Sequence, residues 1–189
     1  MCQYFGRASL SWDRRTMLFR WHNDFFCNQF CLRMRLHGFS IVKGLTKILL
    51  EGQELDLHND YEFTQIDYRI AARQLQLHWV RSAGDWVRPS MPPALTLVCA
   101  GVQVLKIRES GEGEQVNGEK CLSSIGFMWN AMRDDMDGVA SHEASEGCTD
   151  LALIFMSDLS IKIAAAEACI LVGAGPANQA ASIAAQQQL

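Results

Sequence analysis

Hydrophobic and polar residues alternate along most of the central part of the chain, and this period of two is typical of strands with one buried face. The clearest example is RQLQLHWVR, in which Leu75, Leu77 and Trp79 would face one way and the intervening polar residues the other. The stretches FSIVKGLTKILL, ELDLHND and DYEFTQIDYR before it show the same alternation or are rich in β-branched and aromatic residues. The pattern predicts successive strands, with turns at Asn59–Asp60 and at Arg69–Ala72.

The second half of the chain continues in the same way after a proline-rich loop, SAGDWVRPSMPP. ALTLVCAGVQVLKIRE predicts two strands, or one strand bent at Gly101, and KCLSSIGFMWNAM is expected to hold a short helix. DLALIFMSDLSIKIAAAEACILV predicts a hairpin that turns near Ser157–Asp158, followed by a short helical or extended piece.

About eight strands against one or two short helices indicate an α+β fold, mainly antiparallel β-sheet with one or two short helices. We expect a single β-rich globular domain over residues 38–172. A basic, aromatic-rich N-terminal extension (residues 1–37) would precede it, and a flexible Ala/Gln-rich tail (residues 173–189) would follow it.

Charge and composition narrow the partners that the protein can have. The 189 residues carry a formal net charge of -4, which gives no reason to expect nucleic-acid binding. Residues 1–33 hold five arginines and two aspartates but no apolar run of the kind that a secretory signal needs. No apolar stretch reaches the length of a membrane span. The seven cysteines are odd in number and scattered, which is typical of free thiols in a reducing compartment, so we expect a cytoplasmic protein.

The stretch CILVGAGPANQAAS, residues 169–182, resembles the start of a dinucleotide-binding unit. That unit needs a small residue where Asn178 stands, a second strand, and an acidic residue about 20 positions later to hold the ribose. Only 16 residues follow Gly173, and none of them is acidic. We therefore expect no bound cofactor, and we interpret the apolar half of the stretch as the last strand of the domain.

One set of polar residues has the chemistry of a metal site. Asp56, His58 and Asp60 alternate along ELDLHND and would line one face of a strand, and His78 could lie on a neighbouring strand. Imidazole and carboxylate groups are suitable ligands for a divalent metal. A solvated strand face has the same pattern, so a metal site at Asp56, His58 and His78 is an alternative to that interpretation.

A second set has the composition of a protein contact surface. The aromatic residues Trp79, Trp86, Tyr61 and Tyr68 are accompanied by Arg81 and Arg88, and tryptophan, tyrosine and arginine dominate binding hot spots. If they are buried, these aromatic residues form the core of a sheet instead. Trp86, in the proline-rich loop, is the member that we expect to be exposed, so Trp86, Arg81 and Arg88 are the candidate contact residues. No motif of a serine hydrolase, a zinc protease or a phosphate-binding loop occurs in the sequence.

Three stretches, LDLHNDYEFTQIDYRIAARQLQLHWVRSAGDWV, LTLVCAGVQVLKI and DLALIFMSDLSIKIAAAEA, resemble small uncharacterised bacterial β-rich proteins, a domain of unknown function. The resemblance covers about residues 38–172. It implies a strand pair, an apolar strand and a closing hairpin, and it transfers no functional residue. Such proteins tend to have glycine in the closing hairpin, where this chain has Asp158, which should still allow the turn.

We therefore expect a non-enzymatic partner-binding or accessory protein, immunity-like in type, whose partner is another protein. One alternative is a metal-binding protein or metal-dependent enzyme that uses Asp56, His58 and His78. Another is a structural subunit that forms a homodimer through an exposed strand edge.

Overall fold

The computed structural model describes residues 33–109, 118–135 and 138–173. Within these residues the chain forms twelve strands and two three-residue 3-10 turns. The elements in the first half are β1 (Arg35–His37), β2 (Phe39–Ile41), β3 (Lys47–Leu50), β4 (Gln53–Asp56), β5 (Tyr61–Arg69), β6 (Gln74–Arg81), β7 (Ala94–Ala100) and β8 (Val104–Arg108). The elements in the second half are η1 (Gly118–Lys120), β9 (Leu122–Trp129), η2 (Asn130–Met132), β10 (Cys148–Phe155), β11 (Ser160–Ala164) and β12 (Glu167–Gly173).

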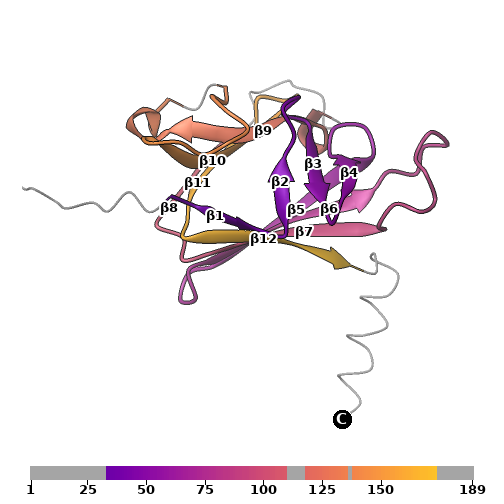
Figure 1. Cartoon of the computed structure of the whole chain (residues 1–189), viewed down its shortest axis with the longest axis horizontal. Coiled ribbons are helices and arrows are strands. Elements are labelled where there is room, and N and C mark those ends of the chain that lie inside the picture. Colours follow the sequence, from indigo (N-terminus) through magenta and orange to yellow (C-terminus); the bar gives the residue numbers. More distant parts are fainter. Residues whose placement is uncertain (1–32, 110–117, 136–137, 174–189) are drawn as a thin grey trace, which may run out of the picture. The chain divides into compact units, whose positions relative to one another are not determined.

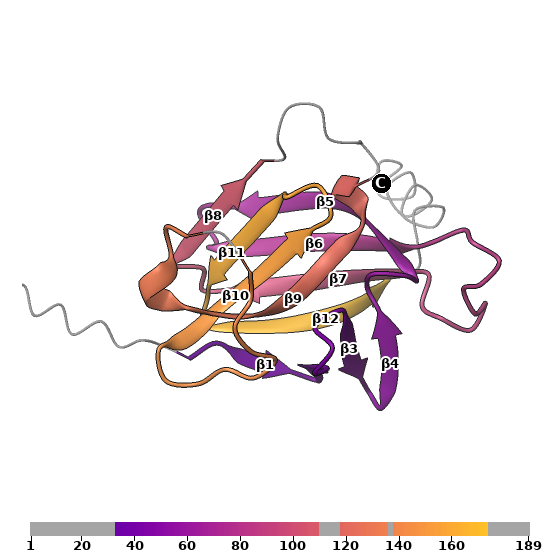
Figure 2. The ribbon, with the colours of Figure 1, turned by 90° about the horizontal axis from the view of Figure 1, so that it is seen from above.

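The strands form three sheets. A five-stranded sheet has the order β1-β12-β7-β6-β5, and a four-stranded sheet has the order β8-β11-β10-β9. A three-stranded sheet, β2-β3-β4, lies beside them (Figure 1). Every pair is antiparallel except β1 with β12, which is parallel. Figure 2 shows the four-stranded sheet lying over the five-stranded sheet, with its strands crossing the lower ones obliquely.

The inner faces of the sheets share one hydrophobic core. Leu75, Leu77 and Trp79 of β6 are all buried in it, as their alternation with polar residues predicts. Phe63 of β5 contacts Phe155 of β10 with ring centroids 4.7 Å apart, so the two larger sheets touch directly. Burial of these apolar faces is the main force that holds the sheets together.

The chain passes between the two larger sheets at two neighbouring places. Gly101, between β7 and β8, has a φ of 66°, and a Cβ added there would lie 3.0 Å from the Cβ of Ala166, in the link between β11 and β12. The amide of Ala166 donates to the carbonyl of Ala100 over 3.1 Å, and the amide of Gln103 donates to the carbonyl of Ala164 over 2.8 Å. ALTLVCAGVQVLKIRE therefore forms two strands, which belong to different sheets.

The predicted fold class is wrong in one respect: the protein is an all-β fold and not α+β. The described residues contain no helix longer than the three-residue turns η1 and η2. The expected helix in KCLSSIGFMWNAM is instead the strand β9, which pairs with β10. Leu122, Ile125 and Phe127 are buried in the core, so pairing and burial decide the conformation of a segment with weak local preference.

Several sequence predictions are confirmed. Turns occur at Asn59–Asp60 and around Arg69–Ala72, and the closing hairpin joins β10 to β11. Asp158 adopts a φ of 61° in that hairpin, a left-handed conformation that aspartate tolerates better than most residues. The apolar piece after the hairpin is extended and forms the last strand, β12. Most of the predicted N-terminal extension and nearly all of the predicted tail, residues 1–32 and 174–189, lie outside the described residues.

The outer face of the four-stranded sheet is also buried at its centre. Lys162 of β11 and Asp150 of β10 are almost fully buried there. The ammonium group of Lys162 donates to the backbone carbonyls of Met132 and Asp135, so it ties the segment after β9 to the sheet. Among the described residues, no helix has the length and apolar character needed to cross a membrane.

Candidate functional site

A cleft of about 460 Å³ opens beside the loop that carries Trp86. It is lined by His58, Asn59, Tyr61, Glu62, Ser82, Trp86, Lys120 and Cys121. These residues come from the turn after β4, the start of β5, the loop after β6 and the segment around η1. Its volume falls within the range of ordinary ligand-binding clefts.

The loop between β6 and β7 is attached to the rest of the protein by two buried side chains and by the side chain of Arg81. Val87 and Met91 are buried in the hydrophobic core. The guanidinium group of Arg81 donates to the carbonyl of Pro89 over 2.7 Å and to the carbonyl of Met91 over 2.8 Å. This loop is therefore attached to the sheet although it contains three prolines and no regular structure.

Trp86 is held in place although 70% of its surface is exposed. Its indole N–H donates to the carbonyl of Asn59 over 3.1 Å. A Cβ added at Gly84 would collide with Cζ2, Cη2 and Cζ3 of the Trp86 ring at nearly equal distances, so it would lie over the ring face and not at its edge. One face of the indole thus packs on the backbone of Gly84, and glycine is the residue that allows this contact.

The turn after β4 is built on the carboxylate of Asp56. This carboxylate accepts hydrogen bonds from the backbone amides of His58 and Asn59, each over 3.0 Å, and from the side-chain amide of Asn59 over 3.0 Å. Such an arrangement caps a turn. The side chain of Asp56 therefore positions the two cleft residues that follow it.

His58 and Cys121, which are far apart in the sequence, contact each other in the lining of the cleft. Nδ1 of His58 lies 2.6 Å from the carbonyl oxygen of Leu122 and 3.5 Å from Sγ of Cys121. Because a carbonyl can only accept, Nδ1 carries the proton, and in the neutral ring Nε2 is left as an acceptor. The thiol of Cys121 donates to the carbonyl of His58 over 3.6 Å.

This pair does not have the electrostatics of a cysteine nucleophile. Burial raises the pKa of the Cys121 thiol, and the nearby charge of Asp56 raises this pKa further. A reactive cysteine needs a lowered pKa, because the thiolate is the nucleophile. The contact between Cys121 and His58 joins the segment before β9 to the turn after β4.

Glu62 and Lys120 are the two charged residues that line the cleft. A carboxylate oxygen of Glu62 lies 3.9 Å from the ammonium group of Lys120, and each side chain is about half exposed. An ion pair of this kind is weak in water. A charged group of a ligand can therefore compete for either partner.

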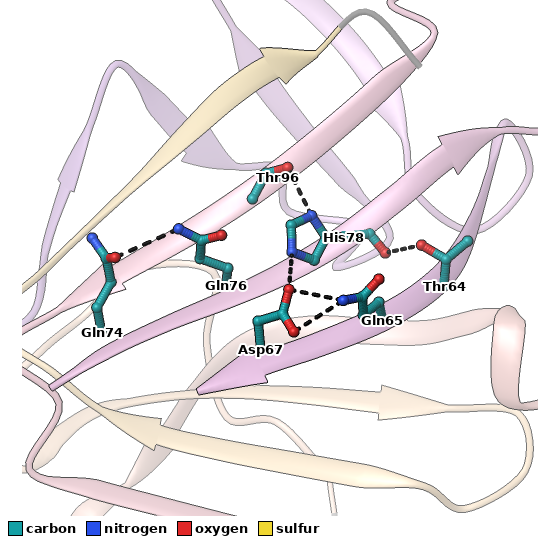
Figure 3. Close-up of polar contacts among 7 residues, drawn as sticks. All are labelled: Thr64, Gln65, Asp67, Gln74, Gln76, His78 and Thr96. Atoms are coloured by element: carbon teal, nitrogen blue, oxygen red, sulfur yellow. Dashed lines mark hydrogen bonds and ion pairs between the residues drawn. The ribbon is translucent and has the colours of Figure 1, made fainter. Parts of the chain in front are cut away.

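A second polar cluster lies on the outer face of the five-stranded sheet (Figure 3). Nε2 of His78 lies 3.1 Å from the carboxylate of Asp67, and Nδ1 of His78 lies 3.1 Å from the hydroxyl of Thr96. The side-chain amide of Gln65 donates to both oxygens of Asp67 over 2.9 Å. The cluster ties together the neighbouring strands β5, β6 and β7.

The order Asp67, His78, Thr96 is similar to a catalytic triad, but its surroundings differ. A nucleophilic hydroxyl needs free donors nearby to stabilise the developing negative charge. Thr96 lies in the middle of β7, whose backbone pairs with β6 on one side and with β12 on the other. The nearest backbone amides are thus used in the sheet, and we interpret the cluster as a surface hydrogen-bond network.

The three residues of the predicted metal site have separate partners. Asp56 caps its turn, His58 bonds to Leu122, and His78 bonds to Asp67 and Thr96. In the described parts of the chain, no group of three or more His, Cys, Asp or Glu side chains is placed to hold a metal ion. The metal site stays a prediction, for metal analysis of the purified protein to test.

The residues of the predicted contact surface differ in their roles. Trp86 and Arg88 are exposed, whereas Arg81 is engaged with the carbonyls of the loop. Sequence reasoning missed Glu62, Lys120 and Cys121 as cleft residues. They lie in segments about 60 residues apart, and no spacing in the sequence links them. Comparison with protein-family models, with curated proteins and with solved structures finds no match to this chain.

Proposed function

We propose that this protein is a non-enzymatic binding or accessory protein that captures a segment of another protein in the cleft beside Trp86. The observation that carries the proposal is the state of Trp86, which is largely exposed yet fixed by Asn59 and Gly84. Tryptophan is among the residues most enriched at the hot spots of protein–protein interfaces.

The rigidity of the loop supports this role. Ordering a mobile side chain on binding weakens an interaction, and a side chain that is ordered beforehand avoids this entropy loss. The buried residues Val87 and Met91 and the hydrogen bonds of Arg81 hold the loop before any partner arrives.

The polar groups around the cleft favour binding over catalysis. The carboxylate of Asp56 is occupied by three hydrogen bonds, and burial raises the pKa of the Cys121 thiol. The cleft instead offers a partner the aromatic ring of Trp86, the acceptor nitrogen of His58 and the exposed ion pair of Glu62 with Lys120.

The test uses the full chain and random dodecapeptides displayed on phage. Peptides selected on the wild-type protein should lose about tenfold or more in affinity for Trp86→Ala. Trp129→Ala is the matched control, because Trp129 is also exposed but does not line the cleft. Binders that tolerate Trp86→Ala, or the recovery of no binder, would overturn the proposal.

A second candidate function is the formation of a homodimer through the edge of the five-stranded sheet. The short strand β1 pairs only with Glu167–Cys169 of β12. Among the described residues, no strand pairs on that side with the rest of β12, where Leu171 and Val172 are 54% and 58% exposed. Such an edge can pair with the same edge of a second copy.

Sedimentation of the full chain tests the dimer. A mass that rises with concentration in the wild type and stays at that of a monomer in Leu171→Lys would support it. A wild-type mass that stays at that of one chain over the whole concentration range would exclude it.

A further inference from the structure

We infer that the cleft recognises a basic side chain of the partner, best an arginine, which stacks on Trp86 and pairs with Glu62. This inference rests on the proposed binding function and specifies the chemistry of the partner. The carrying observation is that three residues line one cleft: Trp86, whose ring is covered by Gly84 on one face, Glu62, whose carboxylate is exchangeable, and His58, whose Nε2 is an acceptor.

The indole favours a cation. Because one face of the Trp86 ring packs on Gly84, the opposite face is the one available to a ligand. The face of an aromatic ring is negative, and tryptophan binds cations best among the aromatic side chains. Guanidinium groups, which are planar and weakly hydrated, also stack on such a face.

The acceptors of the cleft suit the donors of a guanidinium group. Glu62 offers a carboxylate, and Nε2 of His58 is the acceptor of its ring because Nδ1 bonds to Leu122. Arginine carries five N–H donors and no acceptor. One arginine side chain can therefore satisfy several of these groups together.

Among the described residues, the single cation that lines the cleft is already paired with a carboxylate, and the charges around the cleft are mixed. Burial and then Asp60 raise the pKa of the Tyr61 phenol while Arg81 lowers it, and both Asp85 and Arg88 are exposed near Trp86 in the loop. Lys120 is the basic residue among those lining the cleft, and its ammonium group already faces Glu62. An acidic partner would find one cation and a ring face that repels it.

The experiment extends the selection of displayed peptides. Peptides whose affinity depends on Trp86 should share an arginine or lysine at a fixed position. Replacement of that arginine by citrulline, which keeps the shape and removes the charge, should weaken binding about tenfold. Selected peptides that depend on Trp86 but share no basic residue would overturn the inference that the cleft recognises a basic side chain, and would leave the proposed binding function intact.

Two variants of the protein give changes of opposite sign. Glu62→Gln should weaken binding of the arginine peptides by about fivefold, because it removes the partner charge. Lys120→Gln should strengthen binding several-fold, because it removes the competing cation. If the ion pair between Glu62 and Lys120 only held the cleft in shape, both variants would bind the peptides more weakly. The reverse pattern, with Lys120→Gln weaker and Glu62→Gln stronger, would assign the cleft to an acidic partner.

Discussion

The guanidinium group of Arg133 makes two hydrogen bonds to the carboxylate of Asp150. Nε lies 2.6 Å from Oδ2 and Nη2 lies 3.1 Å from Oδ1, and the side chain of Asp150 is only 1% exposed. A buried carboxylate is stable in the charged form only when such partners compensate for its lost hydration. The pair joins the segment after β9 to the strand β10 and closes the outer face of the four-stranded sheet.

Removal of the cation from this pair should destabilise the fold strongly. Arg133→Met should lower the free energy of unfolding by about 3 kcal/mol, because it leaves a buried charge without its two-bond partner. Urea denaturation followed by tryptophan fluorescence measures this change. Arg88→Met is the control: Arg88 is exposed on its loop, and the variant should stay within about 0.5 kcal/mol of the wild type. Equal effects of the two variants would contradict the role of the pair.

Lys162→Met should loosen residues 130–135, the segment that lies over the outer face of the four-stranded sheet. The ammonium group of Lys162 donates to the carbonyls of Met132 and Asp135, which the methionine cannot replace. We expect faster hydrogen exchange of the backbone amides around residues 130–135. Lys47→Met is the matched control, because Lys47 is a strand lysine that pairs with Glu54 and makes neither of these carbonyl contacts. The lysine contacts would be unimportant if both variants exchanged like the wild type.

Gly126→Ala tests the close packing of the segment that lies over β9. A Cβ at this position would lie 2.7 Å from the carbonyl oxygen of Ser141. We expect a loss of about 1–3 kcal/mol in unfolding free energy, because backbone must move to make room. At Gly44, in contrast, an added Cβ meets nothing within 4 Å. Gly44→Ala should therefore leave the midpoint of thermal unfolding nearly unchanged, and a similar drop in both variants would refute the steric argument.

Tyr61→Phe tests the alkaline limit of stability. Burial, reinforced by Asp60 and opposed by Arg81, raises the pKa of Tyr61 from 10.0 to about 12. The folded protein thus keeps this proton longer than the unfolded chain does. The unfolded chain ionises first, and the free energy of unfolding falls as pH rises from about 10 to about 12.

The phenylalanine variant lacks this ionisation and should show a shallower decrease over the same pH range. At neutral pH it should lose about 0.5–1.5 kcal/mol, because the hydroxyl of Tyr61 donates to the carbonyl of Pro92. Ultraviolet titration of tyrosinate provides the independent measurement. A wild-type titration with every tyrosine near pH 10 would show that Tyr61 is not shielded.

Local sequence patterns predicted the strands whose two faces differ. In β6, apolar residues alternate with Gln74, Gln76 and His78, so the buried face can be identified without a structure. The closing hairpin was equally predictable from the sequence, since Asp158 suits a tight turn. The segment of β9 was not, because Gly126 and the serines around it carry no clear period, and its conformation depends on pairing with β10.

The candidate cleft was only partly visible in the sequence. Trp86 stood out because a tryptophan in a proline-rich loop cannot be part of a strand face. Its neighbours in space, Glu62 and Lys120, were hidden because their pairing depends on how two distant segments meet. The same is true of Asp67, His78 and Thr96, which share one face through the register of β5, β6 and β7.

The sequence by itself determined that this chain forms a β-rich domain, where most of its strands run, and that Trp86 lies in a loop. These properties follow from local periodicity and turn chemistry, which act over a few residues. Only the tertiary structure decided that the fold is all-β, that one face of the Trp86 ring is covered by Gly84, and that His58, Glu62 and Lys120 line one cleft. Those properties arise from sheet pairing and packing between residues far apart in the chain, and no local preference encodes them.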